Sequence, residues 1–544
     1  MKHVALLLSF LMFACTALSQ HGPSAPAGGP APTLPGLGDL HHPVSTKNAE
    51  AQRFFDQGLS LSFAFNHDEA LRAFQRAAEL DHGLAMAWWG QALVLGPNIN
   101  LPMDDARGRR AVELAQKARE LAKQAPENER AYIEALVKRY SSDSKADRAA
   151  LDRAYADAMR DVMKRYPDDL DAATLFAEAA MDITPWSYWT RDGKPNPGTE
   201  EIVAVLQSVL RRSPGHAGAC HLLIHAVEAS RHPELALGAA RQLETVAPNA
   251  GHLVHMPTHL YALLGDHDAS ARINEKAAAV DRSYIQRYGV EGVYPALYYN
   301  HNLHFAAYSH AQRGDYRNAI RMADQVFAHA APGAKEMPMI ELFTPTPLLV
   351  QVRFRRWSEV MRAPEPPEHM PITRAVWTFA RGMAEVSTGR TQNAQAALRG
   401  LAAGVKALPA DAMVGFNSGK SVLAVAEHLL AARIAEERRE PAVAIEHLKR
   451  AVEKEDALAY DEPPDWYLHA RESLGGTLLR QGQLDEAEAA FRADLFRHPR
   501  SGRSLFGLME VLKAQGKTWE ARAVERDFRE SWKHADSKLA LTEL

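Results

Sequence analysis

Gly482-Gln483-Leu484-Asp485-Glu486-Ala487, with Phe491 four residues later, is one copy of a pattern that recurs along the chain. A turn that usually contains glycine separates two segments of helical periodicity, and small and aromatic residues recur at fixed offsets in the second segment. Self-similarity of this kind predicts a series of helix–turn–helix units. Further copies lie at residues 66–70 (with Phe74 and Ala77), 313–319 (with Ala323) and 516–521, and looser copies lie at 265–268 and 389–394.

Helical periodicity begins near Thr46 and continues almost to the last residue, whereas the period-2 alternation of strands is hardly found. One helix pair alone leaves an apolar face exposed, so successive pairs must stack to bury it. The sequence therefore predicts an all-α fold, a solenoid of antiparallel helix pairs.

The repeated turn resembles that of the tetratricopeptide-repeat (TPR) family, and the resemblance covers most of residues 46–535. Three further motifs resemble those of exported bacterial TPR proteins: Gly96-Pro97-Asn98-Ile99-Asn100, Pro185-Trp186-Ser187-Tyr188-Trp189 and His255-Met256-Pro257-Thr258-His259. The resemblance implies a TPR-like α-α superhelix. It also implies a scaffold whose concave groove binds a protein or peptide partner.

Composition excludes several other classes of function. The net charge of −4 and the pI of about 6.7 do not favour a nucleic-acid partner. The chain has two cysteines, Cys15 and Cys220, too few for a Cys-rich zinc site. It contains no Gly-x-Ser-x-Gly elbow, P-loop, dinucleotide fingerprint or His-Glu-x-x-His motif.

The first residues predict an exported protein, periplasmic or secreted. Residues 1–19 have the polar start, the short apolar run and the small-x-small end of a signal peptide. Residues 12–15 loosely resemble a lipoprotein cleavage box, but the bulky Phe13 favours plain cleavage over a lipid anchor at Cys15. No long apolar stretch follows Gln20, so we expect no transmembrane segment.

The mature chain is expected to begin with a disordered linker rich in Pro, Gly and Ala. Insertions interrupt the repeats, and their aromatic residues Trp186 and Trp466 either contribute to a site at one rim or only plug the ends of neighbouring repeats. The predicted segments are a linker at 20–45, N-terminal repeats with insertions at 46–215, central repeats at 216–335, C-terminal repeats at 336–535 and a tail at 536–544.

Histidines concentrate in three consecutive central units, which start near Ala217, Gly251 and Asn300. In TPR proteins the second, fifth, ninth and twelfth residues of a unit generally face the groove. Seven of the nine second, fifth and ninth positions are histidine, in a chain with only 24 histidines among 544 residues. The groove residues identified in this way are His221, His225, Glu228, His252, His255, His259, His301 and His304.

Several imidazoles on one helical stripe suit a transition metal such as Zn, Cu, Fe or Ni. The hypothesis is a metal site in this groove, with Tyr298, Asn300 and Tyr308 as candidates to hydrogen-bond the metal ligands from outside. The competing interpretation is a purely structural polar network. An alternative function is a metalloenzyme, either a hydrolase or an oxidoreductase, that uses the same histidines.

Three other groups are weaker candidates. His469 and Glu472 occupy equivalent groove positions and either extend the groove or form a solvated face, and the solvated face is the favoured interpretation. His41-His42 is interpreted as an incidental flexible pair, and Cys220 is expected to point towards its helix pair rather than to a metal.

Overall fold

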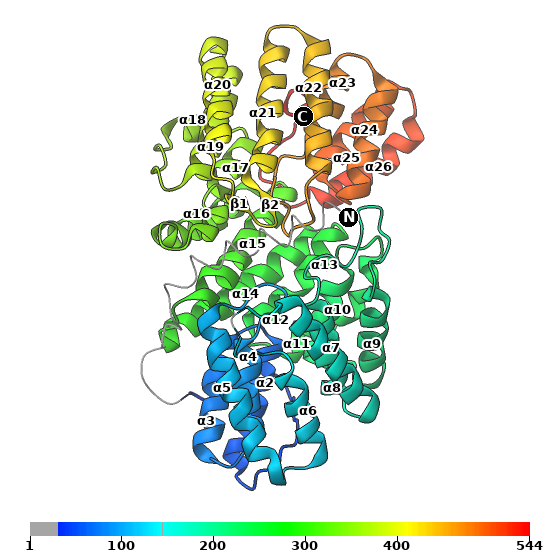
Figure 1. Cartoon of the computed structure of the whole chain (residues 1–544). Helices are drawn as coiled ribbons and strands as arrows, with labels where there is room; N and C mark the ends of the chain where they lie inside the picture. Colours follow the sequence, from blue (N-terminus) through cyan, green and yellow to red (C-terminus); the bar gives the residue numbers. More distant parts are fainter. Residues whose placement is uncertain (1–30, 144) are drawn as a thin grey trace. The chain divides into compact units, whose positions relative to one another are not determined.

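The computed structural model describes residues 31–143 and 145–544, and Figure 1 shows the chain. The expected signal peptide, residues 1–19, lies outside the described residues. The chain forms two compact units. The first unit extends to Leu260 and includes Lys276–Pro295, and the second consists of Tyr261–Glu275 and Ala296–Leu544. The expected central group of repeats, 216–335, is therefore divided between the two units.

The first unit is built of helices joined mostly by short turns (Figure 1). The helices α13 and α14 contribute residues to both units. The bounds are α2 Ala49–Phe63, α3 His67–Leu80, α4 Ala85–Leu95, α5 Asp105–Leu121, η1 Ala122–Gln124, α6 Glu127–Val137, α7 Arg148–Arg165, α8 Leu170–Met181, α9 Thr199–Arg212, α10 Ala217–Val227, η2 Pro233–Ala236, α11 Leu237–Val246, α12 Gly251–His255, α13 Pro257–Leu263 and α14 His267–Tyr288.

The second unit continues the same alternation of helix and turn and adds one two-stranded antiparallel sheet, in which Met413 pairs with Ser418. The bounds are η3 Pro295–Tyr299, α15 Asn300–Gln312, α16 Tyr316–Ala330, η4 Ala331–Gly333, η5 Pro338–Phe343, α17 Thr346–Arg353, α18 Trp357–Arg362, α19 Pro371–Ser387, α20 Thr391–Ala407, β1 Met413–Val414, β2 Asn417–Ser418, α21 Gly419–Glu437, α22 Pro441–Asp456, α23 Ala470–Arg480, α24 Leu484–Arg497, α25 Gly502–Ala514, α26 Thr518–Ser531 and η6 Leu541–Glu543.

The repeated turn ends one helix and reverses the chain. Gly482, between α23 and α24, has a φ of +71°, and Gly516, between α25 and α26, has a φ of +75°. Only glycine adopts this left-handed conformation without a steric penalty, which explains its place in the pattern. Because each such turn is short, the two helices it joins pack side by side as an antiparallel pair.

A buried phenylalanine joins each pair to the next by the same geometry in both units. Phe74 of α3 packs against Gly58 of α2 and Gly90 of α4, and a β-carbon on Gly58 would lie only 2.7 Å from the Phe74 ring. Phe491 of α24 packs in the same way against Gly475 of α23 and Gly507 of α25. Glycine at these positions lets three consecutive helices close around one aromatic ring.

The predicted fold class is therefore confirmed: the protein is all-α, with TPR-like stacking of antiparallel helix pairs. Among the described residues, no helix combines the length and apolar character needed to cross a membrane.

The prediction of a disordered linker over residues 20–45 is wrong for its described part, 31–45. Leu34 N–H donates to Gln57 Oε1 at 2.8 Å, and Asn249 N–H donates to Gly36 O at 2.9 Å. Val44 is buried. An extended chain rich in proline forms no core of its own, but here its carbonyls find donors on the helices and the segment packs along the first unit.

Candidate metal centre

Two of the predicted groove histidines project from the buried helix α10. The His216 side chain caps its N-terminus by accepting from Ala219 N–H at 3.2 Å. His221 and His225 are one turn apart on α10, so their imidazoles lie on one face, and Glu228 follows at the C-terminal end. Proximity of α10 to α2 depends on Gly218, because a β-carbon there would lie 2.6 Å from the Phe63 ring.

The other histidines come from a broken helix. α12 ends at His255 and α13 begins at Pro257, so His252, His255 and His259 lie on two short helical segments in series. All six predicted groove residues of the first unit are buried. Their exposed fractions are 0% for His221, 1% for His225, 2% for Glu228, 3% for His252, 0% for His255 and 1% for His259.

Three imidazoles converge. One ring nitrogen from each of His221, His225 and His252 lies within 4.8 Å of the other two. The Nε2 atoms of His221 and His252 are 3.1 Å apart. Two ligands of one tetrahedral zinc ion, with Zn–N bonds of about 2.0–2.1 Å, are separated by roughly 3.3 Å. The spacing of these two nitrogens is therefore close to the spacing that a shared metal ion requires, and it is also within hydrogen-bond distance.

The Nδ1 atoms of two of these rings, those of His221 and His225, are held by hydrogen-bond acceptors. His221 Nδ1 donates to the carbonyl of Phe63 at 2.7 Å, and His225 Nδ1 lies 2.6 Å from Glu228 Oε1. A proton on Nδ1 leaves a lone pair on Nε2. The buried Nε2 atom of His225 has no hydrogen-bond partner among the described residues. This arrangement, with Nδ1 anchored and Nε2 directed into the cluster, is the one that metal-binding histidines normally adopt.

Glu228 connects this trio to a second pair. Its other oxygen, Oε2, lies 2.5 Å from His259 Nδ1, and His259 Nε2 lies 2.7 Å from His255 Nε2. That second separation is a hydrogen-bond distance and is shorter than two ligands of one metal ion require. Within the first unit, the trio is therefore the better match to a metal ion, and the pair extends the same polar network.

Burial keeps these imidazoles neutral. It lowers the pKa of His225 and of His259 to about 3 and holds the pKa of His221 and His252 well below the usual value. Neutral imidazole is the form that donates a lone pair to a metal ion. The cluster is thus ready to bind a metal at neutral pH without first losing protons to the solvent.

Aromatic rings surround the trio. The Phe65 ring lies 4.4 Å from the His221 ring and stacks on His252 at 5.6 Å, measured between centroids. Trp186 meets His225 edge-on at 5.1 Å, and its indole N–H donates to Ile99 O at 2.8 Å. One insertion thus brings Trp186 against a histidine, and the aromatic shell excludes water and lowers the local dielectric constant.

The remaining predicted residues belong to the second unit. His304 stacks on Tyr467 at 5.4 Å, and burial lowers its pKa to about 3. Tyr308 packs on the same Tyr467 ring, at 5.2 Å. His301 lies 5.8 Å from the Phe305 ring, Asn300 Oδ1 lies 2.7 Å from His329 Nδ1, and Tyr298 is buried.

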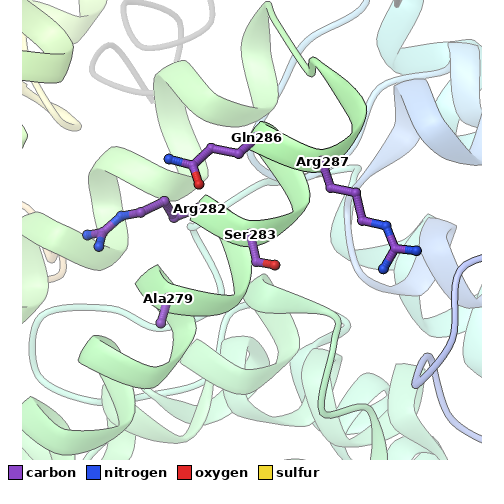
Figure 2. A pocket seen from close by; sticks show the side chains of 5 residues that line it. All are labelled: Ala279, Arg282, Ser283, Gln286 and Arg287. Atoms are coloured by element: carbon purple, nitrogen blue, oxygen red, sulfur yellow. The ribbon is translucent and has the colours of Figure 1, made fainter.

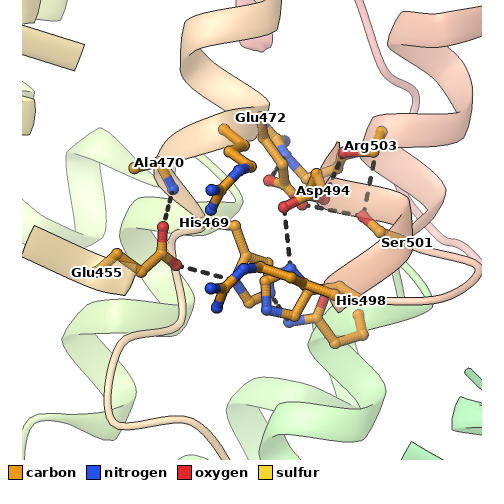
Figure 3. Close-up of polar contacts among 12 residues, drawn as sticks. Glu455, His469, Ala470, Glu472, Asp494, His498, Ser501 and Arg503 are labelled. Atoms are coloured by element: carbon orange, nitrogen blue, oxygen red, sulfur yellow. Dashed lines mark hydrogen bonds and ion pairs between the residues drawn. The ribbon is translucent and has the colours of Figure 1, made fainter. Parts of the chain in front are cut away.

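The interpretation of His469 and Glu472 as a solvated face is wrong, because both are buried in the second unit. Figure 3 shows them in a dense network with Asp494 and His498, whose Nδ1 lies 2.9 Å from Asp494 Oδ1. Burial would lower the pKa of His469, but the hydrogen bond to Glu455 and the nearby carboxylates outweigh it, so the pKa is raised. The hydrogen bonds of His469 and His498 to carboxylates favour a structural polar network, although one atom each of His469, Asp494 and His498 also lies within 4.8 Å of the other two.

His42 is not part of a flexible pair. It is buried, and its Nδ1 lies 2.8 Å from Asp171 Oδ2, whose other oxygen lies 3.1 Å from His216 Nε2. Cys220 is buried with its thiol directed to the Pro214 carbonyl, and burial raises its pKa to about 12. A thiol with so high a pKa is a poor metal ligand.

The described surface has a shallow hollow along one side of α14. Figure 2 shows that a single helix supplies its lining side chains. They are Ala279, Arg282, Ser283, Gln286 and Arg287, and none of them belongs to the histidine cluster.

No protein-family model and no curated protein matches the chain. Among solved structures, a human IFIT1 dimer with PPP-AAAA is similar at 13% identity and a TM-score of 0.33, over 89% of this chain and 91% of that one. The APC/C hetero-tetramer Cut9-Hcn1 is similar at 13% identity and a TM-score of 0.30, over 94% of this chain and 82% of that one. The fold is a TPR-like helical repeat. The histidine cluster is inferred from the residues of this chain and not from these similar structures.

Proposed function

We propose that the first unit of this TPR-like protein binds a transition-metal ion through His221, His225 and His252. The observation that carries the proposal is the convergence of three buried imidazoles, two of which have their Nδ1 atoms anchored by Phe63 O and Glu228. Without a cation, a buried Nε2 such as that of His225 costs about 1–3 kcal/mol as an unsatisfied polar atom.

The donor set narrows the choice of ion. Three neutral imidazoles with a carboxylate behind them favour Zn, Cu or Fe, whereas Ca and Mg prefer oxygen ligands. Glu228 acts through the histidine rings: its Oε1 holds the Nδ1 of His225, and its Oε2 holds the Nδ1 of His259. It therefore fixes ring orientation and adds negative charge next to the cation.

The burial of the three histidines favours a protein that holds a metal ion over one that catalyses a reaction at it. The side chains of the trio are at most 3% exposed, and an aromatic shell that includes Phe65 and Trp186 covers them. A metalloenzyme must admit a substrate to an open coordination position. The alternative of a hydrolase or oxidoreductase would need this shell to open.

The test is the metal content of full-length protein purified without a histidine tag. We expect about one Zn or Cu ion per chain after loading and desalting. His225→Ala and His221→Ala should each lose most of this metal. The matched control is His232→Ala, because His232 is exposed and pairs with the exposed Glu234. Circular dichroism melts check that each variant folds.

Two outcomes would refute the metal site. One is a folded His225→Ala variant that retains as much metal as the wild type. The other is a wild-type protein that takes up no more metal than the His221→Ala variant does. Cobalt loading adds a direct readout, because histidine ligation to Co²⁺ gives visible absorption bands that the His232→Ala control should keep.

Partner binding is the second candidate function, and we propose a protein or peptide partner for the second unit. The observation that favours it is a pocket in that unit beside which arginine side chains already bind the main chain of a short segment, residues 541–544. The proposals of an exported location and of a bound metal ion do not depend on the proposal of this partner.

A further inference from the structure

Residues 541–544 run along a pocket of the second unit that Glu543 and Leu544 help to line. η6, Leu541–Glu543, is followed by Leu544, which is only 3% exposed. The pocket around Leu544 has apolar walls that include Phe379, Leu429 and Leu448. The space left beside the segment is about 70 Å³, enough for roughly two water molecules.

Arginines hold the main chain of this segment. Arg355 donates to the carbonyl of Thr542 at 2.8 Å. Arg480 donates to the carbonyls of Leu541 at 2.9 Å and Leu544 at 3.2 Å. Arg503 donates to the carbonyl of Glu543. Four consecutive carbonyls are thus bound by side chains that recognise backbone and not sequence.

These arginines form part of a dense positive group. Glu436 pairs with Arg433 and Arg480, and Glu472 pairs with Arg353 and Arg503. Burial and the neighbouring arginines lower the pKa of Arg355 to about 10. Arg503 is buried, and a buried donor requires an acceptor, which Glu472 and the carbonyl of Glu543 supply.

The segment is connected to a firmly held stretch. Asp536 accepts from the backbone N–H groups of Tyr316 and Arg317, both at 2.9 Å, at the start of α16. Ser537 Oγ donates to Gly314 O at 3.2 Å. Only residues 538–540 separate this attachment from the pocket. A connection this short gives the segment a high effective concentration at the pocket, in the millimolar range.

We propose that this pocket is a peptide-binding site and that residues 541–544 are its displaceable intramolecular ligand. The partner it fits is a polypeptide segment that presents consecutive main-chain carbonyls and an aliphatic side chain at the position of Leu544. This inference rests on the partner-binding function proposed above and specifies its site. It is independent of the metal centre.

The test uses the full chain and a fluorescent, amidated peptide with the sequence of residues 538–544. Leu544→Lys removes the apolar anchor and places a positive charge among arginines, so it should release the segment. We expect this variant to bind the added peptide about tenfold or more tighter than the wild type does, because the wild-type pocket is already occupied. Thr542→Lys is the matched control, since the Thr542 side chain is exposed.

A second substitution identifies the pocket. Arg480→Ala combined with Leu544→Lys should lose the peptide binding that Leu544→Lys gains, because two carbonyls lose their donor. A scrambled peptide with lysine at the last position should bind neither protein. Equal affinity of wild type and Leu544→Lys, or binding that Arg480→Ala leaves unchanged, would overturn the proposal.

Hydrogen exchange provides a test that requires no mutation. Saturating peptide should increase amide exchange at residues 539–544 of the wild-type chain, because it displaces them. Unchanged protection there at peptide concentrations up to the millimolar range would contradict displacement, even if Leu544→Lys failed to fold. The metal content of each variant should stay at the wild-type level, so failure of this proposal is distinguishable from failure of the metal site.

Discussion

The imidazole Nδ1 of His225 lies 2.6 Å from the carboxylate Oε1 of Glu228, three residues further along the chain. The same carboxylate reaches His259 through its second oxygen at 2.5 Å. One buried carboxylate thus sets the tautomer of two histidines on different helices. Removal of its charge tests whether this orientation matters for metal binding.

Glu228→Gln should weaken metal binding by about 10–100-fold, because an amide offers one acceptor oxygen where the carboxylate offers two and carries no charge. Competition with a chromophoric chelator measures the change. Glu234→Gln is the control, since Glu234 is exposed and pairs with an exposed histidine. Wild-type affinity in a folded Glu228→Gln variant would show that Glu228 does not tune the metal.

The glycines beside the inter-repeat phenylalanines should tolerate no β-carbon. Gly58→Ala in the first unit and Gly475→Ala in the second each place a methyl group 2.7 Å from a buried ring, Phe74 or Phe491. Each should destabilise the protein by about 1–3 kcal/mol. Thermal melts measure the effect.

Gly404→Ala is the matched control for these glycines, because Gly404 is an exposed position inside α20 with open space around it. Alanine is the better helix former, so this variant should gain roughly 0.8–1 kcal/mol. A stabilising Gly58→Ala would contradict the close packing described for the repeats.

Glu472 neutralises two buried arginines, Arg353 and Arg503. Glu472→Gln should cost about 3–5 kcal/mol, because it leaves buried positive charge without a counter-ion. Chemical denaturation followed by circular dichroism measures the loss. The exposed pair Arg450–Glu446 supplies the control, and Glu446→Gln should change stability by less than about 0.5 kcal/mol. Similar effects of the two substitutions would argue against a buried ion network.

The His42–Asp171 pair predicts a pH-dependent contribution to stability. Burial alone would lower the pKa of His42, but the hydrogen bond and charge of Asp171 outweigh it and raise the pKa. Burial would raise the pKa of Asp171, but its bonds to His216 and His42 hold it below the usual value. The His42 contribution is complete below about pH 6.5 and is lost as pH rises through the raised pKa, whereas the Asp171 contribution is lost in acid.

Asp171→Asn should therefore destabilise the protein most between about pH 4 and 6.5, by about 1–3 kcal/mol, and less at pH 8.5. Melts of wild type and variant at pH 5.5 and pH 8.5 give the comparison. Asp168→Asn, at a fully exposed position three residues away, should show no such dependence. An equal loss for Asp171→Asn at both pH values would contradict the ion pair.

Sequence patterns within single helix pairs predicted much of the fold. The glycine turn and the aromatic in copies such as Gly482 and Phe491 predicted antiparallel helix pairs, and the structure confirms them. The i, i+4 spacing of His221 and His225 likewise placed both rings on one face of a helix. Backbone conformation and side-chain direction along one helix are local properties, so local sequence predicts them.

Other features depended on residues far apart in the sequence. The burial of His469 and Glu472 could not be predicted, because it follows from Arg353 and Arg503, which come from other helices. The order in residues 31–45 depends on donors such as Asn249. The only indication in the sequence that Glu472 is buried is that this carboxylate belongs to a helix with an apolar face.

The amino-acid order was enough to establish a TPR-like helical repeat and a stripe of histidines, since both follow from periodicity within single helices. Only the folded chain decides that His252 approaches His221 to 3.1 Å, that Glu228 is shared between two rings and that His304 stacks on Tyr467. These contacts join different helices, so they depend on how the helices pack and not on the spacing within any one of them.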